Sequence, residues 1–329
     1  MIVRPHLQKL VERLRIKQTS LPAAVVYPCD RDSLQLALSG AFAGYLAPEL
    51  VGPEARIRDV ANRAGLDISR LAIVDTPDDP RAAGIRAAER ARDGLVHALI
   101  KGSLGNDDLL APVAAPESGL RGERRLSHAF FVDLPGRPHG MLIADALLNV
   151  SPNLAAKKDI VANTVELAYA LGVLSPAVAV LAAMDAVTPA FPSTADAVAL
   201  KTMAMQGAFR DARVEGPLTV DTALSADAAR ANNAKSEIAG NADVLIAPGM
   251  EAASILVRAL IAMTGGLAAG LVIGAKIPIV APARTDSMEV RMASCVLASL
   301  VVLAAAEPAA NNGPVTTSGP ITEGSRVAA

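Results

Sequence analysis

The chain has 329 residues and a formal net charge of −2, and this length suffices for one large or two medium domains. Hydrophobic residues make up 52% and aromatic residues 2%, so the core must be packed with Ala, Val, Leu and Ile rather than with rings. Basic and acidic residues are interspersed, which excludes the electrostatic footprint of a nucleic-acid-binding protein.

The chain starts with MIVRPHLQKLVERLRIKQ, which predicts a short amphipathic helix because its charges are scattered, unlike those of a signal peptide. Strands and helices then alternate. We predict strands at residues 23–28, 71–74 and 97–101, and helices at residues 33–46, 54–64 and 80–95. This alternation predicts a mainly parallel sheet that is covered on both faces.

The segment LPGRPHG, residues 134–140, interrupts the pattern, and a second alternating series follows it. Strands are predicted at residues 141–147, 177–182, 218–220 and 242–247, and helices at 155–171, 194–206, 226–231 and 251–263. Residues 268–273 and 277–280 would carry the chain back. We therefore expect an α/β protein of two α/β/α domains with mainly parallel sheets, the second inserted into the first, and an active-site cleft between them. The first domain would comprise residues 1–130 plus 272–306 and the second residues 131–271, with a disordered tail at 307–329.

Two features bear on the compartment. Cys29 and Cys295 are far apart in the sequence and lie in or beside apolar runs, so we expect buried free thiols and a cytoplasmic protein. The uncharged run 259–275 is shorter than the ~20 residues that a membrane-spanning helix needs, and Thr264-Gly265-Gly266 interrupts it. We expect a buried helix, a turn and a buried strand there, and no membrane partner.

The segment PIVAPARTDSMEVRMAS, residues 278–294, predicts an anion site. An apolar strand leads into a short loop that presents Arg284 beside the start of a helix. Asp286 and Glu289 have the spacing of a capping box, which would fix the loop geometry next to Arg284.

Other polar loops follow predicted strands, where open α/β sheets bind ligands. Ser193 and Thr194 open a helix, either as an ordinary cap or as a phosphate cradle. Gly240 and Asn241 precede an apolar strand, where the glycine permits either a turn or close approach of a ligand.

Two further segments are candidates. Asp145 and Asn149 follow a buried strand and either orient a ligand or cap the chain turn. Lys101, in the sequence Lys-Gly-Ser, ends a strand and could neutralise a phosphate, although no GxxxxGK[ST] motif occurs.

Several reaction classes lose support. The four histidines show no metal-ligand spacing, so no metal site is expected, and the GxSxG and GxGxxG motifs are missing. His128 could act as a base, but a histidine ahead of the apolar strand AFFVDL is more often packed or hydrogen bonded. The remaining chemistry uses positioned donors, cations and helix ends.

Taken in order, a set of segments resembles the phosphate acyltransferases, that is, phosphate acetyltransferase and phosphate butyryltransferase. These segments are KGSLGNDDLL, ESGLRGERRLSH, IADALLNVSP, PAFPSTADAVALKTMAMQG, EGPLTVDTALS, SEIAGNADVLIAP and ARTDS. The similarity covers residues 23–305 and favours the butyryltransferase-like branch.

The resemblance implies the reaction of acyl-CoA with phosphate to give acyl phosphate and CoA, with a short-chain acyl group and direct transfer in a ternary complex. Coenzyme A and phosphate would be substrates, with no bound cofactor, and the protein would be a homo-oligomer. Arg284 matches the family arginine that engages phosphate, and we assign Arg284, Ser236 and Asp286 to catalysis. Binding of phosphate and CoA is assigned to Ser193, Thr194, Gly240, Asn241, Lys101, Asp145 and Asn149.

The sequence departs from the family where the chemistry is expected. Ala283 replaces the serine that usually precedes the arginine, and Val290 occupies the position of an aspartate in the acetyl-specific branch. An alternative is therefore a catalytically impaired member that binds acyl-CoA or phosphate metabolites. A dehydrogenase with a related two-domain fold is a third possibility, which lacks a cofactor fingerprint.

Overall fold

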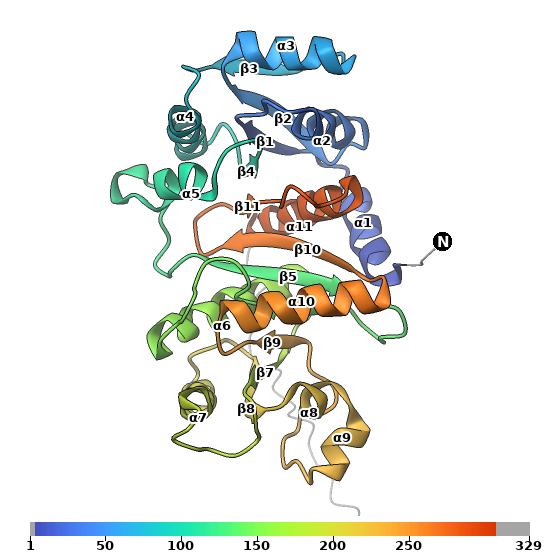
Figure 1. Ribbon diagram of the computed structural model, residues 1–329, viewed down its shortest axis with the longest axis vertical. Coiled ribbons are helices and arrows are strands. Elements are labelled where there is room, and N and C mark those ends of the chain that lie inside the picture. The colour runs from blue at the N-terminus through green and yellow to red at the C-terminus, as the bar shows by residue number, and fades with distance from the viewer. Residues whose placement is uncertain (1–3, 307–329) are drawn as a thin grey trace, which may run out of the picture.

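The computed structural model describes residues 4–306, whose strands pair into one 11-stranded sheet of order β3-β2-β1-β4-β11-β10-β5-β6-β9-β7-β8 (Figure 1). The strands are β1 (Leu21–Val26), β2 (Leu46–Gly52), β3 (Ala72–Asp75), β4 (Ala98–Lys101), β5 (Ser127–Asp133), β6 (Met141–Ala144), β7 (Ala177–Leu181), β8 (Arg213–Leu218), β9 (Val244–Ile246), β10 (Leu267–Ile273) and β11 (Ile279–Val280). The predicted α/β class with a mainly parallel sheet is confirmed.

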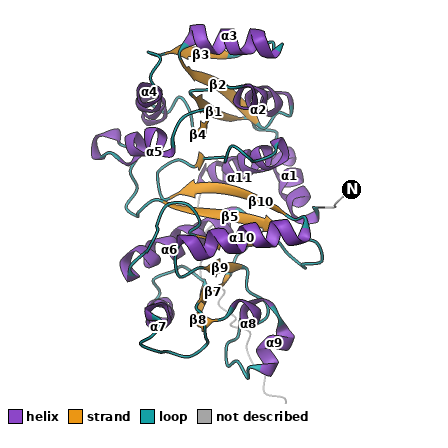
Figure 2. Ribbon diagram, in the orientation of Figure 1, coloured by secondary structure: helices purple, strands orange, loops and turns teal. Residues whose placement is uncertain are grey.

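Helices cover both faces of this sheet (Figure 2). They are α1 (Pro5–Lys17), α2 (Arg31–Phe42), α3 (Glu54–Ala64), α4 (Pro80–Arg92), α5 (Asn106–Ala114), the 3-10 turn η1 (Pro116–Ser118), α6 (Leu154–Ala170), α7 (Pro192–Met205), α8 (Val220–Leu224), α9 (Ala226–Ala231), α10 (Met250–Thr264) and α11 (Met288–Ala306). In Figure 1, α4 and α5 lie on the left at the top of the molecule and α8 and α9 on the right at the bottom. The sheet twists strongly between the two ends, as right-twisted strands require.

Strand direction reverses in the middle of the sheet. β10 is antiparallel to both β11 and β5, and β5 is antiparallel to both β10 and β6. The strands β1–β4 and β11 therefore run one way, and β6–β9 run the other. As a result, the strands of the two sets end on opposite sides of the sheet. The edge at which β4 and β11 end lies opposite to the edge at which β6 ends.

The hydrophobic core is continuous on one face and divided on the other. On one face a single cluster extends from Leu50 on β2 to Val178 on β7 and includes α1, α2, α6 and α11. On β10, Ala268 and Val272 are four residues apart and so share the opposite face. Val272 belongs to the cluster under α4 and α5, whereas Ala268 belongs to the cluster with α10.

Most predicted elements are confirmed within a few residues, and two are wrong in extent. The helix predicted at 33–46 ends at Phe42, and Leu46 already begins β2, which the sequence analysis missed. The strand predicted at 218–220 is β8, which ends at Leu218, and Val220 begins α8. The start of β8 was missed because Gly216-Pro217 is a sequence pattern typical of a turn. Proline is tolerated here because β8 is the outermost strand of the sheet.

The run 259–275 forms the end of α10, a left-handed turn at Gly265 and the buried strand β10, as predicted. In the described part of the chain, α11 is long and apolar enough to cross a membrane by composition, but it is 50% buried inside the protein. The thiols of Cys29 and Cys295 are free, and burial raises their pKa values to about 11 and about 12. Cys295 is buried as predicted, whereas Cys29 is only partly buried, because it lies in the loop between β1 and α2. The division into two domains stays a prediction, and the predicted tail lies outside the described residues.

Packing of α4 against α5 depends on a glycine. A Cβ at Gly84 would lie 2.1 Å from the carbonyl oxygen of Asp108. We expect Gly84→Ala to lower the free energy of unfolding by about 1–3 kcal/mol, because this backbone clash outweighs the higher helix propensity of alanine. Urea unfolding measures the change.

Arg86→Ala, on the exposed side of the same helix, is the matched control. Arg86 forms a surface ion pair with Glu89 at 2.9 Å, so its loss should cost less than about 1 kcal/mol. A Gly84→Ala protein as stable as the parent would contradict the close packing.

Candidate active site

The loop between β11 and α11 carries Arg284 and is closed by local hydrogen bonds. The Asp286 carboxylate accepts from the backbone N–H of Ala283 at 2.8 Å, and the Asp286 N–H donates to the Ala283 carbonyl at 3.1 Å. The Arg284 side chain is exposed. Asp286 therefore fixes the turn that presents Arg284.

The predicted capping box between Asp286 and Glu289 is wrong. The Ser287 hydroxyl accepts from the N–H of Val290 at 3.3 Å and so caps α11. Glu289 instead pairs with Arg4 at 2.8 Å. The carboxylate of Asp286 is already used by Ala283, which is why the neighbouring serine takes the capping position.

Arg291, which the sequence analysis missed, holds this loop from below. It is 6% exposed, and its guanidinium donates to the carbonyls of Asp286 at 3.0 Å and Ala283 at 3.2 Å. Its charge faces the Asp32 carboxylate at 3.8 Å. One indication of this role was present in the sequence, which is that Arg291 is a charged residue within the apolar α11 sequence. An exposed position on the helix would explain such a residue equally well.

Lys101, at the end of β4, lies close enough to this loop to share its electrostatics. Burial lowers the pKa of Lys101, the positive charges of Arg284 and Arg291 lower it further, and Asp286 opposes them. The Lys101 ammonium donates to the Asn106 side chain at 2.8 Å. Like charges gathered around one carboxylate create an electropositive site, which favours an anion.

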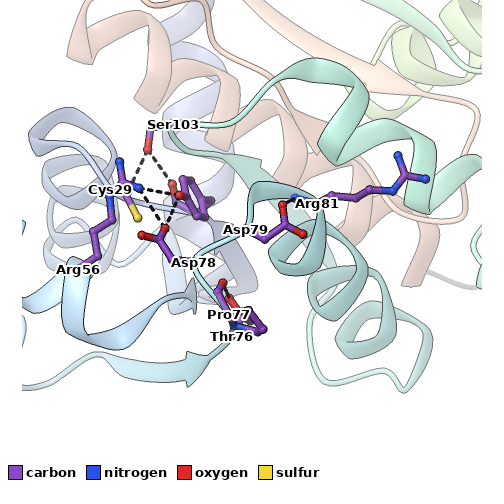
Figure 3. A network of polar contacts seen from close by, with 9 residues as sticks. Cys29, Arg56, Thr76, Pro77, Asp78, Asp79, Arg81 and Ser103 are labelled. Carbon is purple, nitrogen blue, oxygen red and sulfur yellow. Dashed lines mark hydrogen bonds and ion pairs between the residues drawn. The ribbon is translucent and has the colours of Figure 1, made fainter.

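A polar network ties the neighbouring strand ends together (Figure 3). The Tyr27 hydroxyl donates to Asp78 at 2.6 Å, and Arg56 donates to both of these groups at 2.7 and 3.0 Å. The Ser103 hydroxyl accepts from the N–H of Cys29 at 3.1 Å and donates to the Tyr27 carbonyl at 3.0 Å. The two bonds of Ser103 fix the loop that follows Lys101.

Gly102 is required in the same loop. A Cβ on this residue would lie 2.5 Å from the carbonyl oxygen of Val26. The loop after β4 therefore packs directly on the end of β1, and this close approach sets the position of Lys101.

A second polar group follows β6. Asp145 is 2% exposed, and its carboxylate accepts from the N–H groups of Leu147 at 2.9 Å and Leu148 at 3.1 Å and from the Asn149 amide at 2.5 Å. Arg125, another residue that the sequence analysis missed, donates to Asn149 at 3.3 Å. Arg125 and Asn149 line a cavity of about 200 Å³ beside the start of α6.

The two groups lie at different edges of the sheet. β6 runs opposite to β4 and β11, so Asp145 follows a strand that ends at the edge opposite to Lys101. Leu147 and Leu148 nevertheless pack against the hydrophobic cluster that also holds Leu104 and Ala281, from the loops after β4 and β11. One cluster therefore supports all three loops.

The other predicted residues occupy separate positions. The Thr194 hydroxyl donates to the carbonyl of Phe191 at 2.7 Å within its own loop, and the neighbouring Ser193 is partly exposed. This contact is the ordinary local bonding of a helix start. Both residues follow β7 and so belong to the same edge as Asp145.

Gly240 and Asn241 precede β9 and lie at its amino end. The Gly240 N–H donates to the Thr222 carbonyl at 2.8 Å, and the Asn241 side chain contacts the His139 ring at 3.3 Å. Among the described residues, the buried hydroxyl oxygen of Ser236 has no hydrogen-bond partner. The structure thus brings together Lys101, Arg284 and Asp286, while a shared cleft for the remaining residues stays a prediction.

His128 is packed, in line with the interpretation favoured from sequence. It is 2% exposed, and its ring meets Phe130 edge-on with centroids 4.5 Å apart. Burial lowers the pKa of His128 to about 4, although Asp145 opposes the shift. The imidazole is therefore neutral near pH 7.

Comparison with known proteins bears on this site. Residues 81–299 match the family model described as phosphate acetyl/butaryl transferase. A phosphate acetyltransferase of Rhizobium meliloti is 44% identical over 276 residues, which cover 84% of this chain and 87% of the relative. A phosphate butyryltransferase of Clostridium acetobutylicum is 33% identical over 252 residues, covering 77% of this chain and 83% of the relative.

A solved structure agrees with these sequence matches. A branched-chain phosphotransacylase from Enterococcus faecalis V583 superposes with a TM-score of 0.75 at 26% identity, covering 86% of this chain and 99% of that protein. The sequence analysis favoured the butyryltransferase-like branch, whereas the acetyltransferase relative has the higher identity of the two. The chain belongs to the phosphate acetyl/butyryl transferase family.

Proposed function

We propose that the protein catalyses the reversible reaction of a short-chain acyl-CoA with inorganic phosphate to give an acyl phosphate and CoA. The observation that carries this proposal is the electropositive site at Lys101 and Arg284, where burial and the charges of Arg284 and Arg291 lower the pKa of Lys101. A bound phosphate would relieve the repulsion between these positive charges. Family membership supplies the reaction class, and the site supplies the anion recognition.

Arg284 is available for phosphate. In the described part of the chain its side chain has no ion pair, while Asp286 and Arg291 hold its backbone in place. A planar guanidinium can donate two parallel hydrogen bonds to two phosphate oxygens. Arg284 therefore binds phosphate, and Asp286 positions the loop rather than transferring a proton.

The chemistry proceeds by direct transfer. In the direction of acyl-CoA synthesis, the CoA thiolate attacks the acyl carbon of the acyl phosphate, the new C–S bond forms, and the C–O bond to phosphate breaks. Negative charge moves onto the departing phosphate, where Arg284 and Lys101 stabilise it. This scheme requires no covalent enzyme intermediate.

The remaining assigned residues are proposed contacts of the acyl-CoA. Ser236 offers a hydroxyl without a partner among the described residues. Binding contacts are proposed for Asp145, Asn149, Ser193, Thr194, Gly240 and Asn241. We also propose a cytoplasmic homo-oligomer, which follows from the family resemblance.

One observation favours a second candidate function, binding without efficient turnover. Ala283 lacks the hydroxyl that the family serine supplies beside the arginine. Its backbone groups are also engaged, because its N–H donates to Asp286 and its carbonyl accepts from Arg291. The loss of one donor at a reacting centre costs roughly 10²–10³ in rate when nothing replaces it.

Replacing Arg284 tests the leading proposal. We expect Arg284→Ala to lower kcat/KM for phosphate roughly 10²–10³-fold, because the attacking phosphate loses the main cation that binds it. Phosphate-dependent release of CoA from acetyl-, propionyl- and butyryl-CoA is the measurement. Arg258→Ala, which removes an exposed arginine of α10, should leave the rate unchanged, and an active Arg284→Ala enzyme would remove Arg284 from the mechanism.

The lowered pKa of Lys101 gives a pH dependence. Its ammonium loses the proton at lower pH than that of an ordinary lysine, so the KM for phosphate should rise as pH increases through this pKa. In Lys101→Arg the charge persists, because arginine has a pKa above about 12. The ratio of the two KM values removes the ionisation of phosphate itself, and a ratio that stays constant between about pH 7 and pH 10 would contradict the assignment.

Restoring the missing hydroxyl distinguishes the two candidate functions. If the protein is an impaired member, it binds CoA in calorimetry without turnover, and Ala283→Ser should raise kcat by up to roughly 10²–10³. Ala283→Gly is the control, because it changes the residue without adding a donor. Fast turnover by the parent protein would eliminate the second candidate.

A further inference from the structure

A cavity of about 770 Å³ lies on the face with the continuous core. It is bounded by α6, by the last turns of α11 and by the turn between β10 and β11. Its volume falls within the range of roughly 300–1,000 Å³ that is typical of small-molecule sites. The cavity is therefore large enough for a metabolite.

This cavity is separate from the Arg284 site. Ala304 and Ala305 line it at the end of α11, whereas Arg284 precedes the start of the same helix. At 1.5 Å per residue, α11 places these two regions roughly 25 Å apart. A ligand at the end of α11 would therefore lie well away from a phosphate at Arg284.

The charged lining is mainly cationic. Arg13, Arg124, Arg210 and Lys276 face Glu123 and Glu166, so four cations against two carboxylates leave a formal charge of +2. Glu166 lies 3.9 Å from both Arg124 and Arg210, which exceeds hydrogen-bonding distance. The donors of both guanidinium groups are thus not consumed by this carboxylate.

Part of the lining is apolar. Ile273, Ile277 and Val301 contribute aliphatic surface, together with the two alanines of α11. The Arg210 guanidinium stacks over Tyr169 at 4.0 Å from the ring centroid, and this contact positions the guanidinium in the cavity lining.

We propose that this cavity binds an organic diphosphate or triphosphate, at a site distinct from the acyl-transfer centre. The phosphate groups would contact Arg124, Arg210 and Lys276, since paired guanidinium donors match phosphate oxygens. The organic part would lie against Ile277, Val301 and the end of α11. This proposal does not depend on the acyl-transfer function.

Calorimetry of the full-length protein tests the proposal with ADP, pyrophosphate and adenosine as probes. ADP should bind more tightly than pyrophosphate or adenosine alone, because it can contact both the cationic and the apolar residues of the lining. Arg124→Ala combined with Arg210→Ala should weaken ADP binding roughly tenfold to a hundredfold. Arg15→Ala, which removes an exposed cation of α1, should leave it unchanged.

Saturating CoA separates this site from the acyl-transfer centre, because CoA carries the same adenosine and diphosphate groups as ADP. ADP binding that survives saturating CoA and fails in the double variant supports the proposal, whatever the turnover of either protein. Loss of ADP binding in the presence of CoA would assign it to the CoA site of the reaction and overturn the proposal. Undetectable ADP binding, or equal binding by the parent and the double variant, would also overturn it. Melting curves of each variant exclude unfolding as the cause.

Discussion

The antiparallel pairing of β10 with β5 is the constraint on which the rest of the structure depends. Both strands reverse direction relative to their neighbours, so two parallel sets join into one sheet with opposite orientation. The pairing continues over the full length of both strands, from Leu267 opposite Asp133 to Ile273 opposite Ser127. This junction allows one core to extend across the whole of one face while the other face is divided.

The strand reversal also decides where polar groups gather. Lys101 and Arg284 follow parallel neighbouring strands, β4 and β11, and therefore meet at one edge. Asp145 follows β6 and belongs to the opposite edge. Positive charge predominates at the first edge, because Arg284 and Arg291 both act on Lys101 and Asp286 is the carboxylate that opposes them. The proposed phosphate site thus depends on topology as much as on residue type.

Sequence patterns predicted the alternation of elements, because apolar periodicity is a local feature. They also indicated Arg284 beside a helix start, and the anion site there stays a prediction. Sequence patterns failed where contacts between residues far apart in the sequence determine the structure. β2 contains Pro48 and Glu49 and lacks a strand pattern, yet it pairs with β1 and β3 inside the sheet. Arg291 looks like a surface residue in sequence, and its role depends on carbonyls of the preceding loop. The opposite orientation of β6 and β4 likewise has no local sequence mark.

The position of α11 has a consequence for synthesis of the chain. This helix covers the core under strands that are made much earlier, and its Ser299 hydroxyl reaches the carbonyl of Tyr45, 254 residues away in sequence. A growing chain leaves that apolar surface uncovered until the final helix emerges, on the order of ten seconds later at typical translation rates. The ribosome-bound intermediate is therefore a natural substrate for chaperones that bind exposed aliphatic surface.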